Sequence, residues 1–332
     1  MKKIYLIITV LCALFAQCSS VGKSDDTTFV GVHGQLSVKG TALTDKNGKP
    51  VALHGVSFGW HNWWSKYYTP ATVAWLKSDW NANIVRAAIG VEPDNAYLQN
   101  PELAMICLKT VVDAAIENDM YAIIDWHAHR IHLEEAKSFF TQVALRYRDY
   151  PNIIYEIFNE PWGDEMTWEE VKDYSVELIK TIRAIDGDNL ILVGSPHWSQ
   201  DVDVVADSPI EGYGNIMYTL HFYAATHKKG LRDRAGYALS KGLPVFVSEC
   251  AGMEASGDGA IDMVEWEAWK KWMAENDLSW IAWSVSSKTE TCSMIVADDQ
   301  PGSQPSPLYG WKDEELQEWG KIVRDNLQVI NK

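Results

Sequence analysis

The chain has 332 residues and a formal net charge of −16 at neutral pH. So acidic a chain repels the phosphates of nucleic acids and of anionic lipids, which argues against both as partners. A neutral polymer suits it better than an anionic polysaccharide. Its length exceeds what a single β-sandwich needs and is ordinary for one α/β barrel with its loops.

The N-terminus has the pattern of a secretory signal. Lys2 and Lys3 precede an apolar run over residues 4–16, which is too short to cross a membrane. Cys18 follows, and a cysteine there resembles the lipid-attachment site of bacterial lipoproteins, although Gln17 stands where a small residue is usual. Ordinary signal cleavage nearby is the alternative. We expect a secreted protein, held in the bacterial cell envelope if Cys18 carries lipid and otherwise periplasmic or extracellular.

Three parts of the chain follow from this pattern. We expect a signal peptide over residues 1–18, a short polar tether over 19–30 and one folded domain over 31–332. That domain holds three cysteines, an odd number without a Cys-x-x-Cys pair, so neither a disulfide framework nor a structural zinc site is expected.

Short apolar segments recur through the domain and predict buried parallel strands. Most are near-continuous apolar runs, as strands covered on both faces must be. Eight segments qualify: residues 51–56, 84–87, 121–124, 153–157, 189–193, 215–220, 244–247 and 279–283.

Amphipathic helices are predicted between these strands. Asn100 and Pro101 mark one helix start, and Thr167 with Glu170 forms a capping box at another. Residues 259–275 and 312–327 read as further helices. Alternating strands and helices indicate a TIM barrel or a doubly wound sheet. We expect the (β/α)8 TIM barrel, its N-terminal end plugged by a β-hairpin over residues 34–43 with a further turn at 46–48.

Polar and aromatic residues end the predicted strands. In a barrel the C-terminal strand ends form the active site, so these residues are expected to meet on one rim. They are Arg86, Asp125, Trp126, His127, Asn159, Glu160, His221, Tyr223, Glu249 and Trp283.

Two of these rim residues are glutamates, Glu160 and Glu249. Hydrolysis of a glycosidic bond needs two carboxyl groups, one protonated to release the leaving sugar and one ionised to attack or to activate water. Their separation decides the stereochemical outcome, roughly 5 Å for retention and roughly 6.5–9.5 Å for inversion. The sequence leaves this distance open.

The segment Asn159-Glu160-Pro161, with Glu249 at the end of a later strand, resembles glycoside hydrolase family five. More narrowly, it is similar to the bacterial endoglucanase (cellulase) subfamily, over nearly the whole mature chain. An Asn-Glu-Pro triplet alone is weak evidence for this family, whereas an ordered set of motifs is strong evidence. The further motifs are residues 123–127, 134–137, 152–156, 198–201, 221–223, 231–233, 246–249 and 278–280.

The resemblance implies a retaining double displacement, with Glu160 as acid/base and Glu249 as nucleophile. Arg86 is then expected beside Glu249, keeping it ionised, and Tyr223 is expected to orient it. The charge of Glu249 is expected to raise the pKa of Glu160. The substrate-binding residues implied by the resemblance are Arg86, His127, Asn159, His221, Tyr223, Trp283, Trp63, Trp198, Lys288 and Glu290.

The resemblance also implies the partners. The expected substrate is a β-1,4-glucan, which is cut at internal bonds of the polysaccharide. The expected enzyme is a monomer that needs neither cofactor nor metal. Mixed-linkage glucan, mannan or xyloglucan is the alternative substrate within the family. Two departures from the family pattern bear on the subsites. Gly59 stands where many relatives have a histidine, a place that His61 is a candidate to fill, and Gly90 stands where relatives can have a tyrosine.

Two functions of other classes compete with this interpretation. Asp125, His127, His129 and His132 have spacings that can bind metal at a barrel strand end, as in amidohydrolase-like enzymes. A glucan-binding protein without catalysis is the second. Loss of activity with a chelator would support the first, and cellulose binding without release of reducing sugar would support the second.

Overall fold

The computed structural model describes residues 27–332. The expected signal peptide and Cys18 therefore lie outside the described residues. Within the described part, no helix has both the length and the apolar character needed to cross a membrane.

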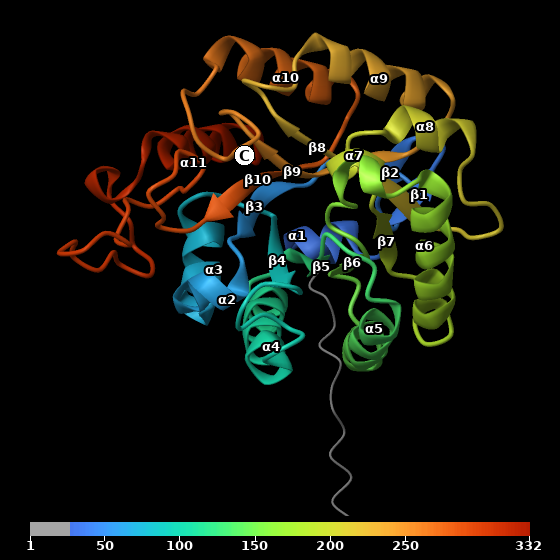
Figure 1. Cartoon of the computed structure of the whole chain (residues 1–332), viewed down its shortest axis with the longest axis horizontal. Helices are drawn as coiled ribbons and strands as arrows, with labels where there is room; N and C mark the ends of the chain where they lie inside the picture. Colours follow the sequence, from blue (N-terminus) through green and yellow to red (C-terminus); the bar gives the residue numbers. More distant parts are fainter. Residues whose placement is uncertain (1–26) are drawn as a thin grey trace, which may run out of the picture.

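Eight parallel strands close into a barrel, as the sequence predicts (Figure 1). Each strand pairs with its sequence neighbours, and the last pairs with the first. Their bounds are β3 (His54–Phe58), β4 (Ile84–Gly90), β5 (Tyr121–His127), β6 (Ile153–Glu156), β7 (Leu190–Val193), β8 (Ile216–Tyr223), β9 (Val245–Ala251) and β10 (Trp280–Val285).

Helices surround the barrel and join one strand to the next (Figure 1). They are α2 (His61–Trp64), α3 (Pro70–Ser78), α4 (Pro101–Glu117), α5 (Leu133–Tyr147), α6 (Trp168–Arg183), α7 (Pro196–Ser199), α8 (Val202–Asp207), α9 (Lys229–Ser240), α10 (Met263–Glu275) and α11 (Glu318–Ile330). Three 3-10 turns, η1 (Ser65–Tyr67), η2 (Gly163–Glu165) and η3 (Asp313–Glu315), complete the elements. The expected caps are present, because Asn100 accepts from the backbone of Leu103 and Thr167 forms the full capping box with Glu170.

The described residues form two hydrophobic cores. A large core fills the space between the strands and the helices. A small core lies inside the barrel at its N-terminal end, where Ile84, Tyr121, Ile154 and other inward side chains meet. Leu36 and Leu43, which flank the hairpin turn, belong to this inner core and are buried, so the predicted plug is confirmed.

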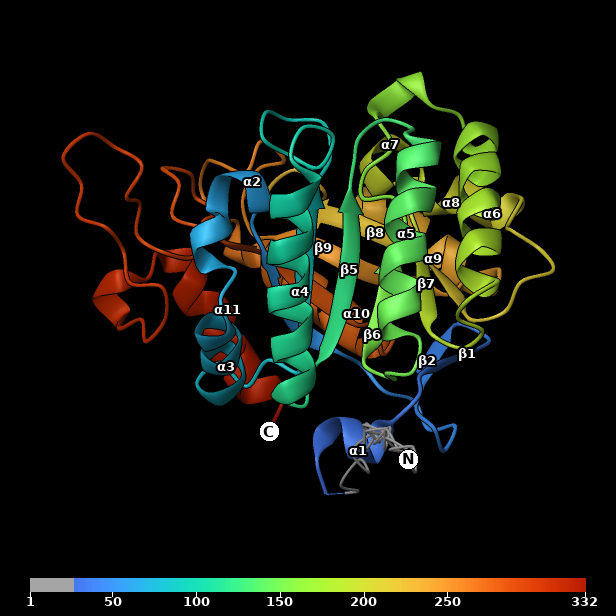
Figure 2. The ribbon, with the colours of Figure 1, turned by 90° about the horizontal axis from the view of Figure 1, so that it is seen from below.

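The hairpin consists of β1 (Ser37–Lys39) and β2 (Ala42–Thr44). Figure 2 shows it, with α1 (Phe29–His33), at the end of the barrel opposite the strand arrowheads. Because α1 begins at Phe29 and Val30 is buried, the folded domain starts before residue 31. The expected tether is therefore shorter than predicted.

Several strands extend further toward their C-terminal ends than the apolar pattern predicts. Asp125 lies within β5 rather than after it, and it pairs there with Arg86 of β4 inside the barrel. The helix expected over 259–275 begins at Met263, since Asp262 caps it. The segment 312–327 divides into η3 and α11, because Leu316 is extended and bridges to Ile295.

A β-bulge in β9 determines which way Glu249 points. β8 pairs with β9 at Thr219–Phe246 and next at His221–Glu249, so β9 uses one residue more than β8 over this stretch. Strict alternation would turn Glu249 outward, because Phe246 belongs to the inner core. The extra residue lets two consecutive side chains, Ser248 and Glu249, both face the inside of the barrel.

The capping box offers a test of local stability. Thr167→Ala removes the side-chain acceptor of the Glu170 amide at the start of α6 and is expected to lower the free energy of unfolding by about 1 kcal/mol. Urea unfolding of the purified protein measures this. Thr181→Ala in the last turn of the same helix is the matched control and is expected to change the free energy by less than about 0.5 kcal/mol. Equal losses for the two variants would contradict the role of the cap.

Candidate active site

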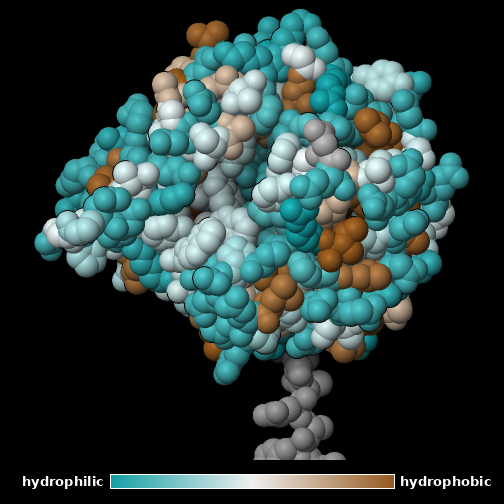
Figure 3. Space-filling model, viewed as in Figure 1, coloured by the Kyte–Doolittle hydropathy of each residue, from teal (hydrophilic) through white to brown (hydrophobic). Residues whose placement is uncertain are grey.

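The C-terminal end of the barrel opens into a cleft, visible as the pale hollow near the middle of Figure 3. Two cavities of about 290 and 350 Å³ make up this cleft. Glu160, Tyr223 and Ala255 line both, so the two cavities meet at Glu160. A long substrate can therefore lie on both sides of this carboxylate.

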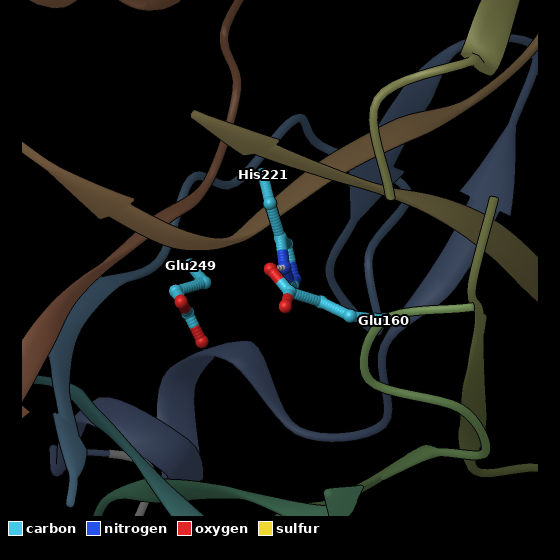
Figure 4. A group of neighbouring side chains, drawn as sticks. All are labelled: Glu160, His221 and Glu249. Carbon is cyan, nitrogen blue, oxygen red and sulfur yellow. Dashed lines mark hydrogen bonds and ion pairs between the residues drawn. The ribbon is translucent and has the colours of Figure 1, made fainter. Parts of the chain in front are cut away.

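Glu160 and Glu249 face each other across the cleft floor (Figure 4). Glu160 follows β6, and Glu249 lies in β9. An oxygen of each carboxylate lies within 4.8 Å of the other and of a ring nitrogen of His221. The Glu160 side chain is 16% exposed and that of Glu249 is 4% exposed, so both can be reached only from the cleft. The pair that the sequence predicts does meet in space.

Arg86 is the fully buried cation beneath these groups. Its guanidinium lies 3.0 Å from Glu249, 2.7 Å from Glu156 and 3.0 Å from Asp125. It also donates to the side-chain oxygen of Asn159 at 2.7 Å. The expectation that Arg86 lies beside Glu249 is confirmed, and its role extends to two further carboxylates.

Glu249 is held at both oxygens. Arg86 donates to Oε2, and the hydroxyl of Tyr223 donates to Oε1 at 2.7 Å, as expected. Burial and the charge of Glu160 raise the pKa of Glu249, while His221, Arg86 and Tyr223 act in the opposite direction.

Glu160 is held by two histidines. His221 Nδ1 lies 3.0 Å from its Oε1, and His129 Nε2 lies 3.3 Å from its Oε2. Burial alone would raise the pKa of Glu160, but the hydrogen bonds from His129 and His221 outweigh it and lower this pKa to about 2. The prediction that Glu160 has a raised pKa is therefore wrong, because two imidazoles bond directly to this carboxylate.

His221 connects the cleft to the buried groups below. Its Nε2 lies 2.9 Å from the hydroxyl of Ser248, which donates to Glu156 at 2.7 Å. Burial would lower the pKa of His221, but the carboxylates of Glu156 and Glu160 outweigh this and raise it to about 9. An imidazolium with a proton on each nitrogen satisfies all these contacts.

The other residues expected near the scissile bond surround the same point. Nδ2 of the buried Asn159 has no acceptor among residues 27–332, so it can donate to a sugar hydroxyl. His127 bonds to Asp125 at 2.6 Å, which fixes its ring. The indole of Trp283 stacks parallel to that ring, with centroids 5.2 Å apart, and lines the cleft.

The predicted outer residues lie on opposite sides of the catalytic pair. Trp63 is 56% exposed and lines the first cavity together with Lys288 and Glu290, which form an ion pair of 2.9 Å. Trp198 lines the second cavity. The two tryptophans can thus bind sugar rings on either side of the cleavage point, since indole faces pack on apolar C–H surfaces.

Trp198 is placed by an unusual backbone segment. His197, Trp198 and Ser199 have φ values of 56°, 53° and 55°, which L-residues adopt at a cost of roughly 1–2 kcal/mol each. The Ser199 hydroxyl donates to the carbonyl of Asn159, and the Trp198 amide donates to that of Pro161. These bonds fasten the segment to the loop that carries Glu160.

The two departures from the family pattern have a common cause. A side chain at Gly90 would meet Trp60 at 2.7 Å, and one at Gly59 would meet Trp64 at 2.8 Å. Both glycines therefore make room for indole rings that line the cleft. His61 is fully buried and accepts from the Gly90 amide, so it does not supply the cleft contact for which it was a candidate.

The metal hypothesis receives no support from the four residues that suggested it. Asp125 and His127 bond to each other, while His129 points to Glu160 and His132 pairs with Glu92. Glu160, His221 and Glu249 do lie close enough to share an ion. These groups already have protein partners, however: His221 bonds to Glu160 and Ser248, and Glu249 accepts from Arg86 and Tyr223.

Sequence reasoning missed four residues of this site. Glu156 and Ser248 are fully buried and complete the network under His221, and an acidic residue inside an apolar strand was the available signal for Glu156. Trp60 and His129 line the cleft. Proximity in sequence to Trp63 was the only pointer to Trp60, whereas the sequence suggested His129 only as a metal ligand.

An eight-stranded barrel with two facing carboxylates at the C-terminal strand ends, in an indole-lined cleft, defines a glycoside hydrolase. Comparison with known proteins agrees. The profile of the family described as cellulase (glycosyl hydrolase family 5) matches residues 44–289. The chain belongs to glycosyl hydrolase family 5.

Relatives cover most of the chain. An endoglucanase of Clostridium saccharobutylicum is 38% identical, over 99% of this chain and 73% of the relative. Endoglucanase Z of Dickeya dadantii is 42% identical, over 86% and 68%. Among solved structures, the catalytic domain of Thermobifida fusca endoglucanase Cel5A superimposes with a TM-score of 0.82 at 31% identity, covering 91% of this chain and 99% of that domain.

Arg86→Met tests the buried charge network. Losing the guanidinium leaves three buried carboxylates without their shared partner, which is expected to lower the free energy of unfolding by more than about 3 kcal/mol. Urea unfolding measures the change. Arg146→Met, which removes an exposed pair with Asp113, is the control and is expected to cost less than about 1 kcal/mol. A loss for Arg86→Met as small as the control's would contradict the network's role.

Proposed function

We propose that the protein is a retaining endo-β-1,4-glucanase, with Glu249 as nucleophile and Glu160 as acid/base. One observation carries the mechanism: oxygens of the two carboxylates lie within 4.8 Å of each other. So close an approach favours the roughly 5–5.5 Å separation of retaining enzymes over the roughly 6.5–9.5 Å that leaves room for the water of an inverting enzyme.

In the first step Glu249 attacks the anomeric carbon while Glu160 protonates the leaving oxygen. Arg86 and the Tyr223 hydroxyl fix both oxygens of Glu249, which aligns the attack. The two histidines lower the pKa of Glu160, so its proton must be supplied. His221, with a pKa of about 9, holds one 3.0 Å away. When sugar displaces water, the lower polarity favours the neutral pair, and the proton moves to Glu160.

In the second step water hydrolyses the glycosyl–enzyme ester. Formation of the ester removes the negative charge of Glu249, and Glu160 has lost its proton to the leaving sugar. Glu160 therefore acts as base toward the water, with His129 still bonded to its Oε2. The proton that Glu160 takes from the water then returns to Nδ1 of His221, which restores the starting protonation of both groups. Release of the sugar regenerates the carboxylate of Glu249.

The cleft supports a neutral β-glucan cut inside its chain. It continues on both sides of Glu160, and Trp63 and Trp198 stand at some distance from the cleavage point on opposite sides. The relatives are named endoglucanases. A glutamate-to-glutamine variant of the Thermobifida fusca enzyme, 30% identical to this chain, was solved with cellotetraose. Mixed-linkage glucan, mannan and xyloglucan are the alternatives that a substrate panel separates.

The activity is tested with carboxymethyl cellulose. We expect the wild-type protein to lower viscosity much faster than it releases reducing ends, which is typical of cleavage within the chain. Glu249→Gln is expected to reduce the rate at least about 10³-fold, and Glu160→Gln about 10²–10⁴-fold. Glu117→Gln, an exposed glutamate at the end of α4, is the control and is expected to leave the rate unchanged. An unchanged viscosity with wild-type protein, or near-normal rates for either catalytic variant, would refute the proposal.

The cellular location of the protein is a separate proposal. Cys18 follows the signal-like run, so we propose that lipid on this residue holds the enzyme in the cell envelope. When the full chain is expressed in a bacterium that processes lipoproteins, radiolabelled palmitate is expected in the wild-type protein and absent from Cys18→Ser. Equal labelling of both proteins, or of neither, would contradict lipidation at Cys18.

A further inference from the structure

Each oxygen of the Glu160 carboxylate has its own histidine. His221 bonds to Oε1 and is 2% exposed, deep in the barrel. His129 bonds to Oε2 from the cleft wall and is 22% exposed. In the proposed mechanism His221 supplies the proton, whereas His129 only helps to stabilise the negative charge of Glu160. His129 was considered in the sequence only as a metal ligand.

The ring of His129 is fixed by aromatic neighbours. It stacks on the indole of Trp60, with centroids 5.6 Å apart and planes 26° apart. The ring of Trp162 meets it at right angles, with centroids 5.6 Å apart. A side chain confined on two sides loses little further freedom when it bonds to Glu160, so its hydrogen bond can hold the carboxylate in one orientation.

The backbone that carries His129 is also fixed. One oxygen of Glu92 accepts the amides of His129 at 3.0 Å and Arg130 at 2.9 Å. The amide of Glu160 donates to the carbonyl of Ala128 at 3.2 Å. The loop after β5 and the residue that performs acid/base chemistry are thus tied together at both backbone and side chain.

We propose that His129 is a positioning residue that holds the acid/base carboxylate of Glu160 in its reactive orientation. The inference rests on the proposed glycosidase function and deepens it. His129 donates to Oε2, whereas the proton that Glu160 passes to the glycosidic oxygen arrives from His221 at Oε1, so the two contacts do not compete. Proton transfer requires the donor within about 3 Å of the leaving oxygen, and a carboxylate free to rotate loses that alignment.

The test separates acid assistance from other effects by varying the leaving group. A 2,4-dinitrophenolate departs without protonation, whereas a phenolate needs it. For His129→Ala we expect kcat/KM on phenyl β-cellobioside to fall about ten- to a hundredfold, since a hydrogen bond to a charged group is lost. On 2,4-dinitrophenyl β-cellobioside kcat/KM is expected to stay within about twofold. Each variant is measured at its own optimal pH, which removes a shifted pKa of Glu160 as the explanation.

Rescue and control variants complete the experiment. His129→Gln retains an N–H donor and is expected to recover most of the activity on the phenyl substrate. His33→Ala is the matched control, because His33 also pairs with a carboxylate and is 24% exposed, but lies at the other end of the barrel. It is expected to leave both substrates unaffected.

Equal losses on both substrates would overturn the proposal, because they would indicate a sugar contact or a structural role. Unchanged kcat/KM on the phenyl substrate would overturn it as well. An inactive wild-type protein would instead refute the proposed function itself, which keeps the two failures distinct. If His129→Ala does not fold, His129→Gln and Glu92→Ala, which frees the loop backbone, carry the same comparison between substrates.

Discussion

The site depends on one buried cation, the guanidinium of Arg86. Three carboxylates approach it within 3.0 Å at the centre of the barrel, where an uncompensated charge is very costly. Because its planar nitrogens point in fixed directions, Arg86 also determines where these carboxylates lie. One of them is Glu249, and the same guanidinium orients Asn159. The stability of the fold and the geometry of the site therefore depend on the same buried guanidinium.

The imidazoles of His129 and His221 influence the protonation of Glu160. His221 and His129 lower the pKa of Glu160, whereas the proposed acid must carry a proton when its substrate arrives. In the proposed mechanism this proton comes from His221. Exclusion of water by the sugar favours the neutral pair, so substrate binding itself promotes the transfer.

Much of this fold could be predicted from the sequence, because all eight strands stand out as apolar runs between helical segments. Glu160 and Glu249 were also found, since they end such runs. The pattern failed where charge is buried, because Asp125 lies within β5 rather than after it, and Glu156 within β6 was not recognised as a site residue. The order of residue types along the chain does not show which side chains contact one another in the fold. The pKa of Glu160, and with it the importance of His129, depends on contacts that only the folded chain creates.

The extra residue in β9 has a consequence for how such a protein could lose its activity. Deleting one position there would restore regular pleating but turn Glu249 toward the helices. Its carboxylate would then leave Arg86 and Tyr223 and enter the apolar layer between the strands and the helices. A loss of one codon, with no side chain in the cleft substituted, would thus separate the facing carboxylates and destabilise the barrel together.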